Sequence, residues 1–122
     1  MVTKVLVVED DQLLKKELLR VLGENDITAV WAKSVQEAKA LLEAEPVALA
    51  LLDVMLGETE SGLDILMHIK QSDKLKKIPV IMLTNNGPID AINRAMELGA
   101  TDYIVKVNTD LKTVVEIVRK HL

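Results

Sequence analysis

The stretch that decides the fold is Val47-Ala48-Leu49-Ala50-Leu51-Leu52-Asp53, which begins directly after the helix-stopping Pro46. It is apolar through Leu52 and ends in a carboxylate. A strand that is apolar at every position is covered on both faces, as in a parallel sheet between two layers of helices. Ligands of such sheets bind beyond the carboxyl ends of the strands. Asp53 is therefore placed where the sheet would carry chemistry, although aspartate is also common where a strand gives way to a turn.

The composition indicates a single globular domain. The chain has 122 residues, of which 49% are hydrophobic and 28% charged, and it contains no cysteine. One continuous core is possible at this size, whereas a disulfide framework and a zinc–thiolate site are excluded. The net charge of −4 and the lack of a basic stripe argue against direct nucleic-acid binding. No apolar run is long enough to cross a bilayer and no signal-like segment follows Met1, so we expect a cytoplasmic protein without membrane contact.

Four other segments also have the pattern of strands, and each of the five is followed by a helical pattern. The predicted strands cover residues 5–8, 27–32, 47–52, 78–84 and 101–105. Apolar residues repeat at helical spacing after each of them. This alternation predicts an α/β fold, in which a five-stranded parallel sheet carries helices on both faces.

Individual residues mark the ends of the predicted helices. Gly23 is expected to end the first helix. Ser34 and Glu37 have the capping-box spacing at the start of the second. Pro88 is suited to the first turn of the fourth helix, where its missing N–H costs nothing. Thr109 is expected to cap the last helix.

Five polar residues end the predicted strands at one edge of the sheet. Glu9 and Asp10 follow the first strand, Asp53 the third, Thr84 the fourth and Lys106 the fifth. Three converging carboxylates would repel one another, and a hard cation such as Mg²⁺ would relieve that repulsion. With a hydroxyl donor and an ammonium group beside them, these side chains fit an in-line phosphoryl transfer to a carboxylate.

Four motifs give the chain a resemblance to a known family over essentially its whole length. They read VVED at 7–10, LLD at 51–53, VIMLT at 80–84 and GATDYIVK at 99–106. In this order and spacing they resemble the receiver domain of two-component response regulators. The resemblance implies a flavodoxin-like, doubly wound (βα)5 fold with strand order 2-1-3-4-5, similar to chemotaxis regulators. It also implies that residues 1–122 form one receiver domain, with no output domain in this chain.

The resemblance assigns a phosphoacceptor and a metal site. Asp53 would accept a phosphoryl group from a histidine kinase, a phosphotransfer protein or a small phosphodonor. Asp10, Asp53 and the backbone carbonyl of Met55 would bind Mg²⁺ directly, and Glu9 would act through water. The domain would catalyse only its own phosphorylation and dephosphorylation, so it would not be an enzyme acting on other substrates.

The resemblance also implies a switch. Thr84 would move to hydrogen-bond the phosphoryl group, Lys106 would pair with it, and Tyr103 would turn inward behind Thr84. The face made of the fourth helix, fifth strand and fifth helix would then change its affinity for a downstream protein, an output domain or a second copy in a homodimer.

Several residues depart from the family pattern and keep a second interpretation open. Gly57 and Val107 stand where the family commonly has proline, and Asn85 stands where it has a small residue. Gly62 opens the third helix nine residues after Asp53, one more than usual. The alternative function is therefore a phosphorylation-independent interaction module on the same fold. A nucleotide-binding function is disfavoured, because acidic residues after the first strand would repel phosphate.

The missing proline after Lys106 predicts a trans peptide bond. A cis bond before a residue such as Val107 costs about 2.5–4 kcal/mol. We still expect the ammonium group of Lys106 to approach Asp53, because its flexible stem can absorb a displaced backbone. His68 and His121 are expected at a surface helix position and at a frayed chain end, with no functional role.

Overall fold

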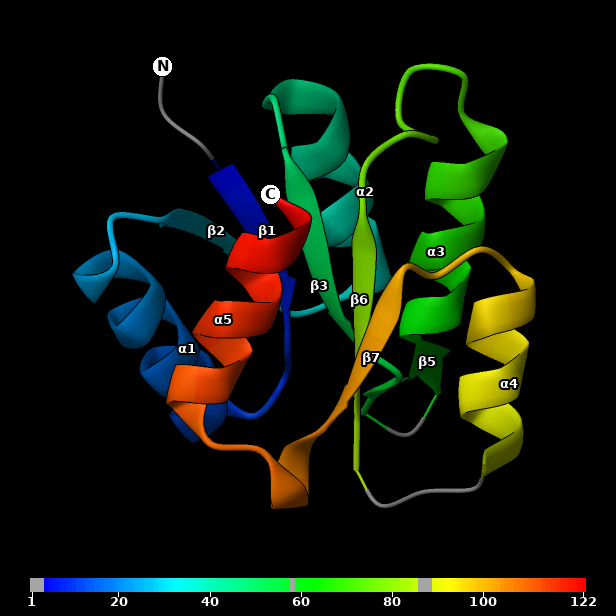
Figure 1. The fold of residues 1–122 in the computed structure, drawn as a ribbon. Helices are drawn as coiled ribbons and strands as arrows, with labels where there is room; N and C mark the ends of the chain where they lie inside the picture. The colour runs from blue at the N-terminus through cyan, green and yellow to red at the C-terminus, as the bar shows by residue number, and fades with distance from the viewer. Residues whose placement is uncertain (1–3, 58, 86–88) are drawn as a thin grey trace.

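A five-stranded parallel sheet forms the centre of the molecule (Figure 1). The structure is a computed structural model that describes residues 4–57, 59–85 and 89–122. The strands of this sheet are β1 (Lys4–Val8), β2 (Thr28–Ala32), β3 (Leu49–Asp53), β6 (Val80–Thr84) and β7 (Asp102–Val105). Their spatial order is β2-β1-β3-β6-β7, which confirms the predicted order for a doubly wound sheet. Every residue of the central strand β3 is buried, as its unbroken apolar run predicted.

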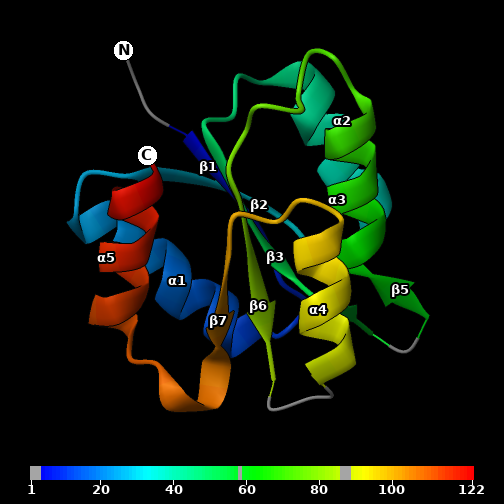
Figure 2. The same cartoon turned by 45° about the vertical axis from the view of Figure 1, so that its right-hand side comes forward.

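Helices cover both faces of the sheet (Figures 1 and 2). The helices are α1 (Gln12–Glu24), α2 (Val35–Ala44), α3 (Gly62–Gln71), α4 (Ile89–Glu97) and α5 (Leu111–His121). The pair α1 and α5 packs on one face, where Leu18 and Val118 are fully buried against the strands. On the other face, α2, α3 and α4 contribute Leu42, Ile65 and Ala95 to a second apolar cluster. The sheet is therefore buried between two apolar cores.

Two of the predicted helix ends are wrong. Gly23 lies inside α1, and the left-handed backbone conformation after this helix belongs instead to Asp26, with φ 63°. Aspartate tolerates this conformation better than most side chains. Thr109 does not cap α5, because its hydroxyl donates to the carbonyl of Val105 at 2.8 Å. Asp110 is the cap, and its carboxylate accepts from the N–H of Thr113 at 2.8 Å.

Ser34 caps α2 as predicted, but the return bond of the capping box is shifted by one residue, from the N-cap to Lys33. The hydroxyl oxygen of Ser34 accepts from the N–H of Glu37 at 3.2 Å, and the Glu37 carboxylate accepts from the N–H of Lys33 at 3.3 Å. The expectation for Pro88 lies outside the described residues. In the described ranges, no helix combines the length and the apolar character that a membrane span requires.

The segment between β3 and α3 contains a small antiparallel hairpin. Its strands are β4 (Met55–Leu56) and β5 (Glu60–Ser61). The Glu60 carboxylate accepts from the N–H of Val35, at the start of α2, at 3.0 Å. The hairpin is therefore attached to the helix layer on that face of the sheet.

Gly62 fixes the start of α3 directly behind Asp53. Its N–H donates to the carbonyl of Val54 at 3.0 Å. A Cβ atom at this position would lie inside van der Waals contact of the Asp53 carbonyl oxygen. Only glycine allows the helix to begin this close to the end of β3.

Candidate functional site

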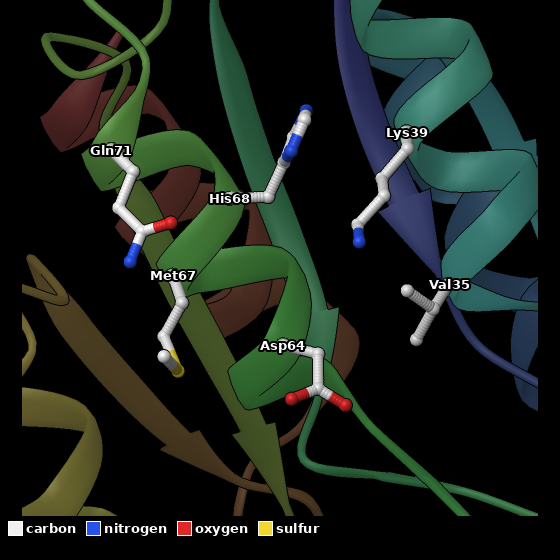
Figure 3. A pocket seen from close by; sticks show the side chains of 6 residues that line it. All are labelled: Val35, Lys39, Asp64, Met67, His68 and Gln71. Atoms are coloured by element: carbon white, nitrogen blue, oxygen red, sulfur yellow. The ribbon is translucent and has the colours of Figure 1, made fainter.

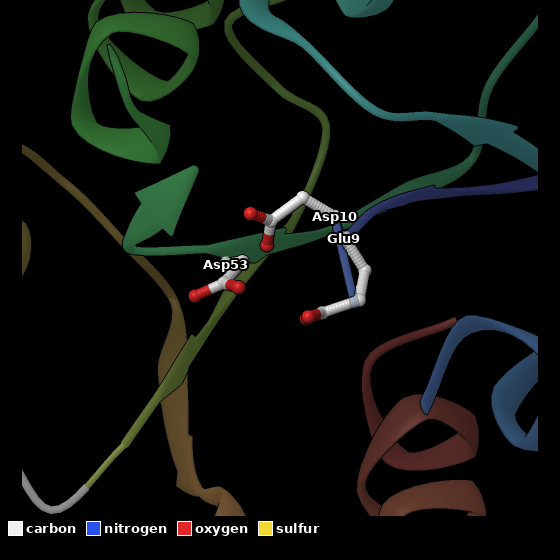
Figure 4. A group of neighbouring side chains, drawn as sticks. All are labelled: Glu9, Asp10 and Asp53. Carbon is white, nitrogen blue, oxygen red and sulfur yellow. The ribbon is translucent and has the colours of Figure 1, made fainter. Parts of the chain in front are cut away.

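The carboxyl ends of β1 and β3 bring three carboxylates together (Figure 4). One oxygen each of Glu9, Asp10 and Asp53 lies within 4.8 Å of the others. Glu9 and Asp53 are buried, whereas Asp10 is exposed at the mouth of the site. Oxygen donors of this kind and number suit a divalent cation such as Mg²⁺. These are the three acidic side chains that the sequence placed at this edge.

Lys106 supplies a positive charge between the two buried carboxylates. Its Nζ atom lies 2.8 Å from Oδ2 of Asp53 and 2.9 Å from Oε2 of Glu9. The Nζ atom donates its hydrogen bond to the other carboxylate oxygen of Glu9, Oε1, at 3.2 Å. The described peptide bonds are all trans, including the one before Val107, and residues Lys106–Asn108 form one turn of 3₁₀-helix, η1. Both halves of the prediction for Lys106 are therefore confirmed.

Burial shifts the protonation equilibrium of the site. The pKa of Glu9 is raised to about 7, mainly by burial and also by the negative charge of Asp53, while Lys106 opposes the shift. Burial alone would lower the pKa of Lys106, but its hydrogen bonds to Asp53 and Glu9 outweigh this and raise it. The ammonium group consequently stays charged, and the titrating group near neutral pH is Glu9.

Backbone N–H groups of the hairpin segment hold two of the carboxylates. The N–H of Gly57 donates to Oδ2 of Asp10 at 2.8 Å, and the N–H of Met55 donates to Oδ1 of Asp53 at 3.1 Å. A proline at position 57 could not make the first of these bonds. Gly57, whose φ is +67°, thus replaces a rigid residue with a donor that restrains Asp10. The ligand role of the Met55 carbonyl stays a prediction.

The remaining site residues lie around these carboxylates in different environments. Thr84 is buried, and its hydroxyl donates to the carbonyl of Asn85 at 2.7 Å. Tyr103 exposes 42% of its surface, so its inward turn stays a prediction for the phosphorylated state. An open pocket of about 300 Å³ is lined by Glu9, Asp10, Asp11, Leu14, Asp53, Met55, Gly57, Asn85 and Lys106. Asn85 therefore lines the pocket that opens onto Asp53.

Sequence reasoning missed Trp31 as a residue of this region. Its indole N–H donates to the backbone carbonyl of Glu9 at 2.8 Å, although the two residues are far apart in the chain. The contact depends on the orientation of the Trp31 side chain at the end of β2, which no local sequence signal reveals. Asp11 is also part of the framework, because its carboxylate accepts from the N–H groups of Leu13 and Leu14 and caps α1.

The two histidines lie away from the acidic cluster. His121 is not frayed, because its Nε2 atom lies 3.1 Å from Oδ2 of Asp102 and joins the end of α5 to β7. His68 lies 3.6 Å from the Glu43 carboxylate. Together with five other residues it lines a second pocket, between α2 and α3 (Figure 3): Val35, Lys39, Asp64, Met67 and Gln71.

Comparison with known proteins gives a consistent result. The family model described as the response regulator receiver domain matches residues 5–119. The chain is 35% identical over 103 residues to the response regulator protein PilR of Pseudomonas aeruginosa, covering 84% of this chain and 22% of PilR. It is 36% identical over 106 residues to the phosphate regulon transcriptional regulatory protein PhoB of Escherichia coli, covering 87% and 46%. The chain thus spans less than half the length of either relative.

Solved structures show the same likeness. A putative response regulator from Chloroflexus aurantiacus has a TM-score of 0.89 and 27% identity, with 98% of this chain and 97% of that chain covered. The phosphorylated cyanobacterial phytochrome response regulator RcpA has a TM-score of 0.83 and 27% identity, with 98% and 91% covered. Both agree with the described chain in fold over nearly its full length.

Proposed function

Because this chain belongs to the family of response regulator receiver domains of two-component systems, we propose that Asp53 accepts a phosphoryl group in a Mg²⁺-dependent reaction. Domains of this family are signalling domains rather than classical enzymes. The proposed donor is a histidine kinase, a phosphotransfer protein or a small phosphodonor. The observation that carries the proposal is the position of the Lys106 ammonium between Glu9 and Asp53, with Asp10 at the open side of the site.

For phosphoryl transfer to Asp53, the protein mainly has to supply side chains at the right positions and with the right charges. A carboxylate oxygen of Asp53 forms the new bond to phosphorus, while the bond from phosphorus to the donor's imidazole nitrogen breaks and that nitrogen keeps the electron pair. Bound Mg²⁺, held by Asp10, Asp53 and the Met55 carbonyl with Glu9 behind a water, would neutralise charge on the phosphoryl oxygens. Lys106 is already 2.8 Å from Asp53, so its ammonium group needs only a short movement to pair with a phosphoryl oxygen.

The proposed switch follows from the added charge. A phosphoryl group brings about −1.5 to −2 charges and three acceptor oxygens. The Thr84 hydroxyl would then exchange the Asn85 carbonyl for a phosphoryl oxygen, and Tyr103 would move inward behind it. The face formed by α4, β7 and α5 would change its affinity for a partner or for a second copy of the domain. Since the curated relatives are longer than this chain, that partner is either a separate protein or a further domain.

The alternative is an interaction module that works without phosphorylation. The hydrogen bond from Gly57 to Asp10 favours it, because that bond occupies one oxygen of a proposed metal ligand. Asn85 on the approach to Asp53 favours it as well.

Intact-mass measurement separates the two functions. The chain is incubated with Mg²⁺ and acetyl phosphate, and in parallel with a histidine kinase and ATP. We expect one phosphoryl adduct that is stable in acid and labile in base. Asp53→Asn should abolish it, and Asp102→Asn, which lies outside the acidic cluster, should retain it. A wild-type chain that gains no adduct from any donor would favour the interaction module.

Mg²⁺ binding without phosphate tests the metal site separately. Asp10→Asn should weaken the affinity strongly, because a direct ligand loses its charge, and Glu9→Gln should weaken it less. Calorimetry or NMR titration measures both. An unchanged affinity in Asp10→Asn would remove Asp10 from the metal site.

A further inference from the structure

Trp31 is bound to the acidic segment through its side chain. The residue lies in β2, and its indole N–H donates to the carbonyl of Glu9 at 2.8 Å. The N–H of Glu9 in turn donates to the carbonyl of Ala32 at 3.2 Å. Both backbone polar groups of Glu9 are therefore held by the end of β2.

The indole replaces a strand partner that the sheet no longer provides. β1 and β2 pair in parallel up to Val8 and Ala32, after which β2 ends and the chain turns into α2. The Glu9 carbonyl thus lies one residue past the last pair. Among the described residues, the indole N–H is the donor that reaches it. Glu9 is fully buried, so its carbonyl would otherwise be costly to leave unpaired.

The indole ring itself is fixed on two sides. It is half-buried against the apolar cluster beneath α1, and the Nζ atom of Lys15 lies 4.2 Å from the ring centroid. A cation at this distance attracts the face of the ring. The donor is thus held at a fixed point beside the acidic segment.

We propose that Trp31 is a positioning residue for the acidic site, acting through the peptide that links Glu9 to Asp10. A peptide unit is planar, so a fixed carbonyl also fixes the direction in which the next Cα leaves it. Asp11, the cap of α1, anchors the other end of the acidic run. The carboxylates of Glu9 and Asp10 are thereby aimed at Asp53 before any cation arrives. This inference rests on the proposed function, because it takes the three carboxylates as a Mg²⁺ site.

If Trp31 orients the Glu9–Asp10 peptide in advance, it should increase the affinity of the site for Mg²⁺. If the indole N–H is lost, the ligands remain but the Glu9–Asp10 peptide gains freedom, which Mg²⁺ binding must then remove. We expect the affinity for Mg²⁺ to fall by about three- to tenfold, the scale of one neutral hydrogen bond. At saturating Mg²⁺ the rate of phosphorylation by acetyl phosphate should return to within about twofold of wild type, since the reacting groups are unchanged.

The test removes the donor and keeps the shape. Trp31 is the one tryptophan of the chain, so β-(benzothiophen-3-yl)alanine can replace it throughout, with a sulfur atom in place of the N–H. NMR titration with MgCl₂ gives the affinity, and urea unfolding without Mg²⁺ gives the stability. Lys16→Met is the matched control, because Lys16 is exposed on the same helix, and its loss leaves both the indole N–H bond and the cation over the ring in place; its Mg²⁺ affinity should stay within about twofold of wild type.

The outcomes distinguish a role of Trp31 in positioning the Mg²⁺ ligands from a role in stability alone. Weaker Mg²⁺ binding in the sulfur analogue, with Lys16→Met unchanged, supports the inference. An unchanged Mg²⁺ affinity in the analogue, whatever its stability, would overturn it and leave Trp31 a structural residue. Failure of the proposed phosphorylation would be detected by a different experiment, the intact-mass measurement, as the absence of an adduct in the wild-type chain. A weakened Mg²⁺ site in the analogue would support positioning even then.

Discussion

The Nζ atom of Lys106 lies 2.8 Å from Oδ2 of Asp53, although their strands β7 and β3 are separated by β6. The same nitrogen lies 2.9 Å from Glu9. Without a bound metal, the ammonium group is therefore the cation that offsets the charge of the two buried carboxylates. Several properties of the site follow from this arrangement.

Lys106→Met should destabilise the metal-free protein. Two buried carboxylates would lose a charged hydrogen-bond donor, which costs about 1–3 kcal/mol in the free energy of unfolding. Urea unfolding at pH 8 without Mg²⁺ measures the loss, and Mg²⁺ should restore part of it. The control is Lys112→Met, because Lys112 is exposed on α5. Equal losses in both variants would contradict the assigned role of Lys106.

The stability of the metal-free protein should fall as pH rises toward neutrality. The pKa of Glu9 is raised from 4.5 to about 7, so between these values the native state holds a proton that the unfolded state has released. The free energy of unfolding therefore decreases as pH rises through this window and levels off above it. Glu9 contributes a slope of up to about 1.4 kcal/mol per pH unit.

Glu9→Gln isolates this effect. Its unfolding free energy, measured in urea at several values between pH 5 and 8, should depend less steeply on pH than that of the wild type. Other titrating groups contribute to both proteins, so the difference between the two curves is the measured quantity. Parallel curves would mean that Glu9 titrates normally in the folded state.

Two glycines should respond in opposite directions to alanine. Gly62→Ala places a methyl group against the Asp53 carbonyl and should destabilise the domain by more than 1 kcal/mol, roughly the scale of an overpacked core. Gly23→Ala lies in α1 with open space around it and should stabilise by about 0.5–1 kcal/mol. Thermal or urea unfolding of the pair checks both signs. A stable Gly62→Ala protein would show that α3 can move away from Asp53.

Tyr103 should become less exposed when Asp53 carries a phosphoryl mimic. It is the one tyrosine of the chain, so 3-fluorotyrosine gives a single ¹⁹F resonance. Addition of beryllofluoride with Mg²⁺ should shift this resonance and reduce its sensitivity to solvent, because the ring leaves its half-exposed position. Thr84→Val should still bind the mimic but lack the shift. The same shift in Thr84→Val would separate Tyr103 from Thr84.

The sequence predicts most of the acidic site because the site depends on topology. Parallel strands end at one edge of a sheet, so Glu9, Asp10 and Asp53 had to meet once the strands were recognised. Lys106 was expected near these carboxylates for the same reason, because it follows a strand that ends at the same edge. Its flexible side chain can reach Asp53 whichever path the backbone takes after Val105. The cost of a cis bond before valine then decided the peptide geometry.

Other features of the structure were not predicted, because no periodic pattern of apolar residues indicates them. The strands β4 and β5 have two residues each, too few to show alternation. Asp110 and Thr109 are both suitable caps, and only the chain path after η1 decides between them. The bond from Trp31 to Glu9 depends on the orientation of the indole side chain, which is not visible in the sequence.

The hairpin segment connects the acidic site to α2 through hydrogen bonds, on the face of the sheet opposite to α5. Gly57 binds the Asp10 carboxylate at one point, and Glu60 binds the N–H of Val35 at the start of α2 at another. A ligand of α2 that favours one position of the hairpin would therefore change the affinity for Mg²⁺. By thermodynamic reciprocity, Mg²⁺ would change the affinity of that ligand by the same factor. The hydrogen bonds of Gly57 and Glu60 thus form a physical connection from the acidic site to the start of α2.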